Sequence, residues 1–180
     1  SPCITRHVVA DYATNSFGPN ARGINMAGQI QSRLDELGIS LPDGPAPVAN
    51  YVPYVVHGSL VFVSGQIPFV DGELNYIGTV GDDVTLEDGQ SAARVCALNV
   101  LAQVKAACDG DLDRVTRCVR LGGYVNGSAD FKQHPQVMNG ASDLMVEIFG
   151  DKGRHARFAV GAGNLPAGVA VEVEGVFEIA

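Results

Sequence analysis

Near the C-terminus, Arg157 stands at the start of an apolar strand pattern, and Glu172 and Glu174 occupy alternate positions of the next one. A guanidinium grips a planar carboxylate through two parallel hydrogen bonds, which an ammonium cannot reproduce. A neighbouring carboxylate could orient a water molecule or accept a proton. If the two strands pair across the connection at 163–168, these side chains could face one small anionic substrate. The alternative is a set of solvated charges on a closing hairpin.

A second candidate is the segment Ser-Gly-Gln-Ile-Pro that begins at Ser64. Gly65 would let a ligand approach the backbone, whose N–H groups could then donate hydrogen bonds. The alternative is a bend that simply ends a strand. The sequence contains no dinucleotide-binding, nucleotide-triphosphate or zinc-protease motif, and no histidine has a nucleophile partner that spacing identifies. We therefore expect neither an organic cofactor nor a metal.

Hydrophobic periodicity predicts the elements that would position these residues. One long helix is expected after Thr85 as its N-cap, and a second begins with Pro135 in its first turn. The predicted strands cover 54–56, 60–63, 114–125, 157–162 and 169–179, and the predicted helices cover 86–108 and 134–150. This order indicates a single α+β domain in which two helices cover one face of a mixed sheet. Apolar side chains on the other face would imply an oligomer.

The first 47 residues of the chain are expected to precede the domain itself. Residues 1–25 do not share the periodicity that follows, so we interpret them as an N-terminal extension that need not belong to the natural protein, with Met26 as a natural start. Residues 26–47 are expected to form a short amphipathic helix and a Pro/Gly linker. Residues 48–180 would then form the domain itself.

The amino-acid composition limits the kinds of partner and surroundings that the protein is expected to have. Lys and Arg number 12 against 20 Asp and Glu, and a net charge of −8 disfavours a phosphate backbone, which is bound mainly through basic side chains. The four cysteines show no C-x-x-C spacing, so we expect them to be reduced and structural, which points to a cytoplasmic protein. No run approaches the roughly 20 apolar residues that a membrane-spanning helix needs.

Together, the segment S-G-Q-I-P and the later pattern R-x7-L-P-x5-E-x-E resemble the RidA family, also called YjgF and, in older usage, endoribonuclease L-PSP. The resemblance covers about residues 48 to 180. It implies a chorismate mutase-like fold, assembled as a homotrimer whose sheets form a central β-barrel with ligand clefts between subunits. It also implies hydrolysis of reactive enamines and imines, such as 2-aminoacrylate and 2-iminopropanoate, to a 2-keto acid and ammonia without a cofactor.

The same resemblance implies a role for particular residues. Arg157 would bind the substrate carboxylate, and Glu172 would place the attacking water. The residues that would line the substrate site are Tyr51, Ser64, Gly65 and Asn139.

Two departures from the family pattern concern the cleft. Ala159 stands where a cysteine is often found, and Ala49-Asn50 replaces the Gly-Pro that precedes the pocket tyrosine. Two other functions stay open. One is a non-catalytic small-molecule-binding or chaperone-like trimer, which an altered cleft allows. The other is a ribonuclease or translation inhibitor, which the net charge and the lack of a histidine pair placed for RNA cleavage disfavour.

Overall fold

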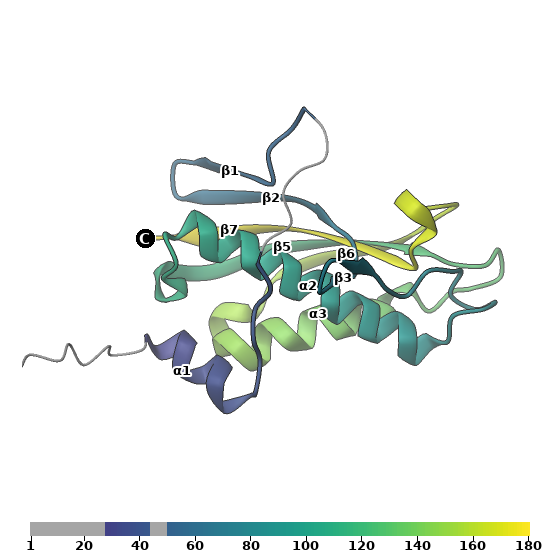
Figure 1. The fold of residues 1–180 in the computed structure, drawn as a ribbon, viewed down its shortest axis with the longest axis horizontal. Helices are drawn as coiled ribbons and strands as arrows, with labels where there is room; N and C mark the ends of the chain where they lie inside the picture. The colour runs from purple at the N-terminus through teal and green to yellow at the C-terminus, as the bar shows by residue number, and fades with distance from the viewer. Residues whose placement is uncertain (1–27, 44–49) are drawn as a thin grey trace, which may run out of the picture.

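The computed structural model describes residues 28–43 and 50–180. The extension predicted for residues 1–25 and the start at Met26 lie outside these residues, and the division into extension, linker and domain stays a prediction. Figure 1 shows the arrangement. The helices are α1 (Gln29–Glu36), α2 (Leu86–Ala107) and α3 (His134–Phe149), and the strands are β1 (Tyr54–His57), β2 (Leu60–Gln66), β3 (Phe69–Val70), β4 (Glu73–Leu74), β5 (Val115–Asn126), β6 (Ala156–Ala162) and β7 (Val171–Ile179). Three short 3-10 helices lie at Leu112–Arg114, Gly150–Gly153 and Pro166–Gly168.

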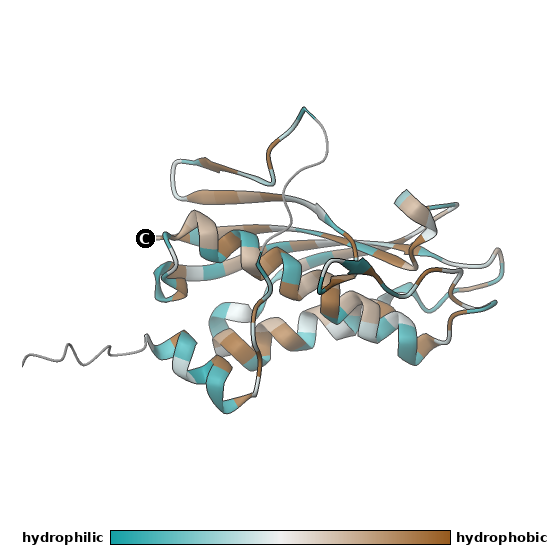
Figure 2. Cartoon of the chain, viewed as in Figure 1, coloured by the Kyte–Doolittle hydropathy of each residue, from teal (hydrophilic) through white to brown (hydrophobic). Residues whose placement is uncertain are grey.

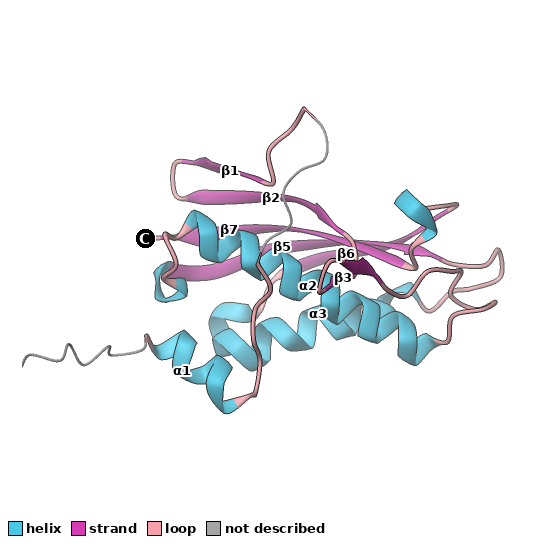
Figure 3. Cartoon of the chain, viewed as in Figure 1, coloured by secondary structure: helices cyan, strands magenta, loops and turns pink. Residues whose placement is uncertain are grey.

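Five strands form one mixed sheet in the order β1-β2-β7-β5-β6. All neighbours are antiparallel except β5 and β6, which are parallel because α3 carries the chain back along the sheet between them. The helices α2 and α3 lie together on one side of this sheet (Figure 3). The predicted α+β class, with two long helices on one face of a mixed sheet, is confirmed.

The pairing of the last two strands differs from the simplest expectation. They do not pair across the connection at 163–168, because β5 lies between β6 and β7 and bonds to both. In register, Leu121 of β5 is opposite Arg157 on one side and opposite Gly175 on the other. The arginine therefore lies on an edge strand, two strands away from the glutamates of β7.

Local sequence explains both long helices. Asp88 N–H donates to the Thr85 hydroxyl over 3.1 Å, which satisfies one of the unpaired donors at the start of α2 as the N-cap prediction requires. Pro135 lies in the first turn of α3, and Gly150 ends that helix with a positive φ of 58°. The predicted apolar stripe of α3 is buried throughout, at Val137, Met138, Ala141, Leu144, Met145 and Ile148.

The side of the sheet away from the helices carries exposed apolar groups, and β2 is drawn largely hydrophobic in Figure 2 although no described helix lies over that side. Phe62 lies between two buried valines of β2, so it points away from the helices and remains 44% exposed. Tyr124 and Val160 are register partners on the same side. These three residues are called the open-face patch below.

Among the described residues, Cys96, Cys108 and Cys118 are free thiols buried in the core, and burial raises the pKa of Cys118 to about 12. No helix in this part of the chain has both the length and the apolar character that crossing a bilayer requires.

Candidate functional site

Arg157 lies at the start of β6 with its side chain against α3. Its Nη1 donates to Asn139 Oδ1 over 3.0 Å and to Ser142 Oγ over 3.1 Å. Asn139 and Ser142 are three residues apart on α3 and therefore share one helix face. Asn139, which the resemblance assigns to the substrate site, thus contacts Arg157, and Ser142 is a second oxygen partner that the sequence did not indicate.

These two bonds use both hydrogens of Nη1, since a guanidinium nitrogen of this type carries two. The Nε and Nη2 atoms make no hydrogen bond with the described residues, and the side chain is exposed. The edge of the guanidinium formed by Nε and Nη2 is therefore open to a ligand, and it has the spacing that a carboxylate accepts bidentately.

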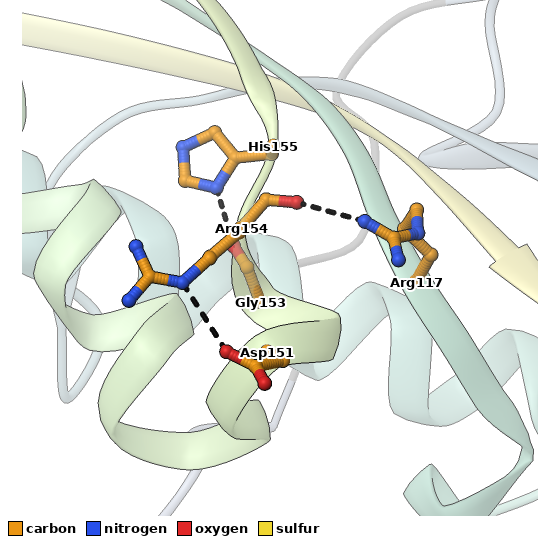
Figure 4. Close-up of polar contacts among 5 residues, drawn as sticks. All are labelled: Arg117, Asp151, Gly153, Arg154 and His155. Atoms are coloured by element: carbon orange, nitrogen blue, oxygen red, sulfur yellow. Dashed lines mark hydrogen bonds and ion pairs between the residues drawn. The ribbon is translucent and has the colours of Figure 1, made fainter.

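His155 extends this hydrogen-bonded group. Its Nδ1 lies 2.6 Å from the carbonyl oxygen of Gly153, as Figure 4 shows, and its Nε2 lies 3.0 Å from Ser142 Oγ. Burial, with a further contribution from the Arg157 charge, lowers the pKa of the His155 ring against the opposing effect of the Gly153 carbonyl. The ring is therefore neutral near pH 7. Asn139, Ser142, His155 and Arg157 are called the arginine cluster below.

Glu172 belongs to a separate group on β7. The alternation of the strand is as predicted: Val171 and Val173 are fully buried under the helices, while Glu172 and Glu174 point to the open side. Half-burial raises the pKa of the Glu172 carboxyl. No hydrogen bond or ion pair to this carboxylate comes from the described residues, whereas Glu174 pairs with Arg120 over 2.9 Å.

Gly65 lies directly beside the Glu172 carboxylate. A Cβ atom at this position would collide with Glu172 Oε1, so the absence of a side chain there is what admits the carboxylate. The register between β2 and β7 shifts between Val63 and Gln66, which marks a bulge of the kind often found next to functional sites. The backbone at Gly65 is exposed, as the sequence interpretation requires.

Ser64 links this second group to the segment before β1. Ser64 donates from its hydroxyl to the carbonyl of Val52 over 2.9 Å, and its N–H donates to the carbonyl of Pro53. These bonds hold the segment before β1 against the bulge, and Tyr51 in that segment is 51% exposed. Ser64, Gly65 and Glu172 are called the glutamate cluster below, and the assignment of Tyr51 to the same site stays a prediction.

The two clusters do not meet within one chain. Arg157 lies in register with the buried Leu121 and points to the helix side, while Glu172 points to the open side. They are two strands apart, about 10 Å, and three residues apart along the strands, about another 10 Å. The single-chain pocket that pairing of the last two strands would have formed is therefore absent, and a site that uses both clusters needs a second copy of the chain.

The sequence contained a signal for the residues that were missed. Asn139 and Ser142 have the spacing of neighbours on one helix face, and His155 and Arg157 have the alternate spacing of neighbours on an extended segment. Periodicity does not indicate that this face of α3 packs against the start of β6.

The chain is similar to proteins of one known family. Residues 31–173 match the protein family described as "YjgF/chorismate mutase-like, putative endoribonuclease". Protein TCP17 of Trypanosoma cruzi is 48% identical over 154 residues, which cover 85% of this chain and 96% of that protein. The crystal structure of Atu1372 from Agrobacterium tumefaciens has a TM-score of 0.79 at 45% identity, covering 84% of this chain and 92% of that chain. The structure of E. coli TdcF with bound serine has a TM-score of 0.56 at 23% identity, covering 77% and 94%, and supports the fold alone.

A mixed five-stranded sheet backed by two long helices, with this element order, is the α+β chorismate mutase-like architecture. The chain belongs to the YjgF/chorismate mutase-like family, also called the RidA family, which confirms the resemblance found in the sequence. The names of TCP17 and Atu1372 state no activity, so the residues of the site must indicate the reaction.

Proposed function

We propose that the chain hydrolyses reactive enamines and imines of small 2-amino acids, such as 2-aminoacrylate and its tautomer 2-iminopropanoate, to a 2-keto acid and ammonia. The observation that carries the proposal is Arg157, which two α3 oxygens hold by Nη1 while its Nε–Nη2 edge stays open. A 2-imino acid has a planar carboxylate next to the carbon that water attacks. Binding that carboxylate therefore places the reacting carbon at a fixed distance from the arginine.

Glu172 supplies the second requirement of the reaction. In 2-iminopropanoate, water adds to the carbon of the C=N bond, a proton moves to nitrogen, and ammonia leaves as the carbonyl forms. A half-buried carboxylate with a raised pKa can orient that water and accept its proton closer to neutral pH than an ordinary glutamate can. The same carboxylate favours the protonated, more electrophilic imine. No step needs a metal or an organic cofactor.

Because the two clusters face opposite sides of the sheet, the proposal requires that Arg157 of one copy approaches Glu172 of another. The open-face patch supports such an assembly, since apolar side chains on an uncovered sheet are typical of an interface. We propose the homotrimer of the family as the working form, with its clefts between subunits.

The test is keto-acid release from 2-aminoacrylate that a serine dehydratase generates in the same cuvette. We expect Arg157→Ala to lower kcat/KM at least about 100-fold, since two charge-assisted hydrogen bonds are lost. Glu172→Gln should lower kcat with a smaller change in KM, because the amide neither accepts the proton nor stabilises the iminium charge.

Arg154→Ala is the matched control. This neighbouring arginine is exposed and bonds through its Nε to Asp151 over 3.3 Å (Figure 4), and it makes no side-chain bond to Asn139 or Ser142 among the described residues. It should keep wild-type release. Equal rates for wild type and Arg157→Ala would contradict the proposal.

The second candidate is a binding protein without catalysis. The bound serine of TdcF favours it, because that ligand also presents a carboxylate to a protein of this fold. Carboxylate binding that depends on Arg157, together with no acceleration of release from any of several 2-imino acids, would establish this function instead. The endoribonuclease in the family description fits the chain poorly, since a net charge of −8 repels RNA.

A further inference from the structure

The Arg157 side chain ends a continuous line of hydrogen bonds that runs through Ser142 and His155 to the backbone. Arg157 Nη1 donates to Ser142 Oγ over 3.1 Å, and Ser142 Oγ lies 3.0 Å from His155 Nε2. His155 Nδ1 lies 2.6 Å from the Gly153 carbonyl oxygen. Three elements contribute to this line: α3, the 3-10 turn at Gly150–Gly153, and the start of β6.

The direction of each bond follows from the chemistry of its partners. A carbonyl oxygen only accepts, so the Nδ1 of His155 carries a hydrogen and donates it to Gly153. The neutral ring then has a bare Nε2, which accepts the single hydrogen of the Ser142 hydroxyl. Ser142 therefore has only lone pairs to offer Arg157, and it cannot turn its hydrogen toward the guanidinium.

This arrangement fixes how the arginine presents itself. With its hydroxyl hydrogen committed to His155, Ser142 is a permanent acceptor for one Nη1 hydrogen, and Asn139 Oδ1 is the acceptor for the other. Two acceptors on one nitrogen stop the guanidinium plane from rotating. The edge made by Nη1 and Nη2 is closed, and only the Nε–Nη2 edge remains for a ligand.

We propose that Ser142 and His155 are positioning residues that lock Arg157 with its Nε–Nη2 edge outward, so that the site selects carboxylates that bind side-on. The inference rests on the proposed function in one respect, namely that Arg157 binds the ligand carboxylate. It goes beyond that function because it assigns positioning roles to Ser142 and His155 and defines which edge of the Arg157 guanidinium binds the carboxylate.

The experiment measures pyruvate, the keto-acid product, binding to the full chain by calorimetry, together with the NMR signal of the Arg157 Nε–H. We expect Ser142→Ala to weaken pyruvate binding about tenfold, the effect of one hydrogen bond to a charged group. His155→Phe should weaken it in the same direction by less, because Ser142 still accepts from Arg157 but is no longer held by the ring. The Arg157 Nε–H signal, identified by its absence in Arg157→Lys, should broaden in both variants because the guanidinium is released.

Conservative variants separate positioning from folding. Ser142→Thr keeps the hydroxyl, and His155→Gln offers a neutral acceptor, so both should bind pyruvate within about twofold of wild type. In the release assay, Ser142→Ala should raise KM while leaving kcat nearly unchanged, because the water-placing Glu172 is not affected. Thermal unfolding midpoints of all four variants report any general loss of structure.

Several results would overturn the inference. These are wild-type pyruvate affinity and a sharp Arg157 signal in Ser142→Ala, failure of both conservative variants to restore binding, or no pyruvate binding by the wild-type chain. Failure of the proposed function is a different result: pyruvate binds through Arg157 and responds to Ser142→Ala as expected, but the wild-type chain releases no keto acid from 2-aminoacrylate. In that case Ser142 and His155 do position Arg157, and the proposed hydrolysis is wrong.

Discussion

Glu172 is a charged residue on a strand that is otherwise mostly buried, and it has no described partner to offset the loss of hydration. Burial without a partner disfavours the ionised form, which is why the pKa of this carboxyl is raised. A carboxylate kept in such surroundings lowers the stability of the folded chain at neutral pH. Groups retained at this cost are typical of functional sites.

A stability measurement tests this cost directly. Because the folded pKa is raised, the folded state holds its proton to higher pH than the unfolded state, so the contribution to stability is present below the ordinary value of 4.5 and is lost as pH rises. We expect Glu172→Gln to increase the free energy of unfolding in urea at pH 7 and to have little effect below pH 4.5.

Glu73→Gln, at the exposed first residue of β4, is the control and should change neither value. A Glu172→Gln variant no more stable than wild type at pH 7 would show that the carboxylate is well solvated.

At the scale of elements, periodicity predicted the two helices, the buried stripe of α3 and the alternation along β7. It did so because a single buried face imposes one repeat on each element. Periodicity specifies which face of a strand is buried but not which strand lies beside it. The position of β6 at the edge, next to β5, follows from the crossover through α3, and that is a property of the folded chain rather than of any one segment.

The candidate site, too, could be predicted from the sequence only in part. The residue types and the pattern shared with the family pointed to Arg157, Glu172 and Asn139, and the structure places Asn139 on the arginine. The sequence could not reveal that the arginine and the glutamate face opposite sides of the sheet, because that depends on strand order. Ser142 and His155 were missed for the same reason, since they meet only when α3 packs on β6.

The depth at which α3 packs depends on Gly140. A Cβ atom there would collide with the backbone carbonyl oxygen of Gln90 on α2, so the two helices touch through their backbones. Gly140→Ala should push α3 outward and lower the free energy of unfolding by about 1–3 kcal/mol, as overpacking does in close-packed interiors. The same shift should weaken pyruvate binding, since Asn139 and Ser142 move with the helix.

Urea denaturation and calorimetry would measure both effects. Gly163→Ala is the matched control, because a Cβ at that exposed glycine meets nothing within 4 Å. Equal free energies of unfolding for the two variants would show that a methyl group at position 140 fits between α2 and α3.

At the scale of the whole molecule, the open-face patch would connect the site to the assembly that we propose. A charge in the centre of an apolar interface is costly unless it is paired. We expect Phe62→Asp to convert an assembled chain largely to monomers, measured by sedimentation velocity, and to abolish keto-acid release although every cluster residue is intact.

Val146→Asp makes the same change on an exposed apolar residue of α3, and it should leave both the sedimentation and the release unaltered. Full activity of a monomeric Phe62→Asp chain would show that one copy suffices.

The parallel pairing of β5 and β6 has a consequence for how this protein can diversify. Arg157 and the oxygens that hold it all come from the uninterrupted stretch 115–162, whereas Tyr51, Gly65 and Glu172 come from segments before and after it. Under the proposed function, the residues that would bind the carboxylate and those that would place the water therefore come from different segments of the sequence. If that function holds, substitutions within 115–162 could change which acid is bound and leave the residues that place the water unaltered.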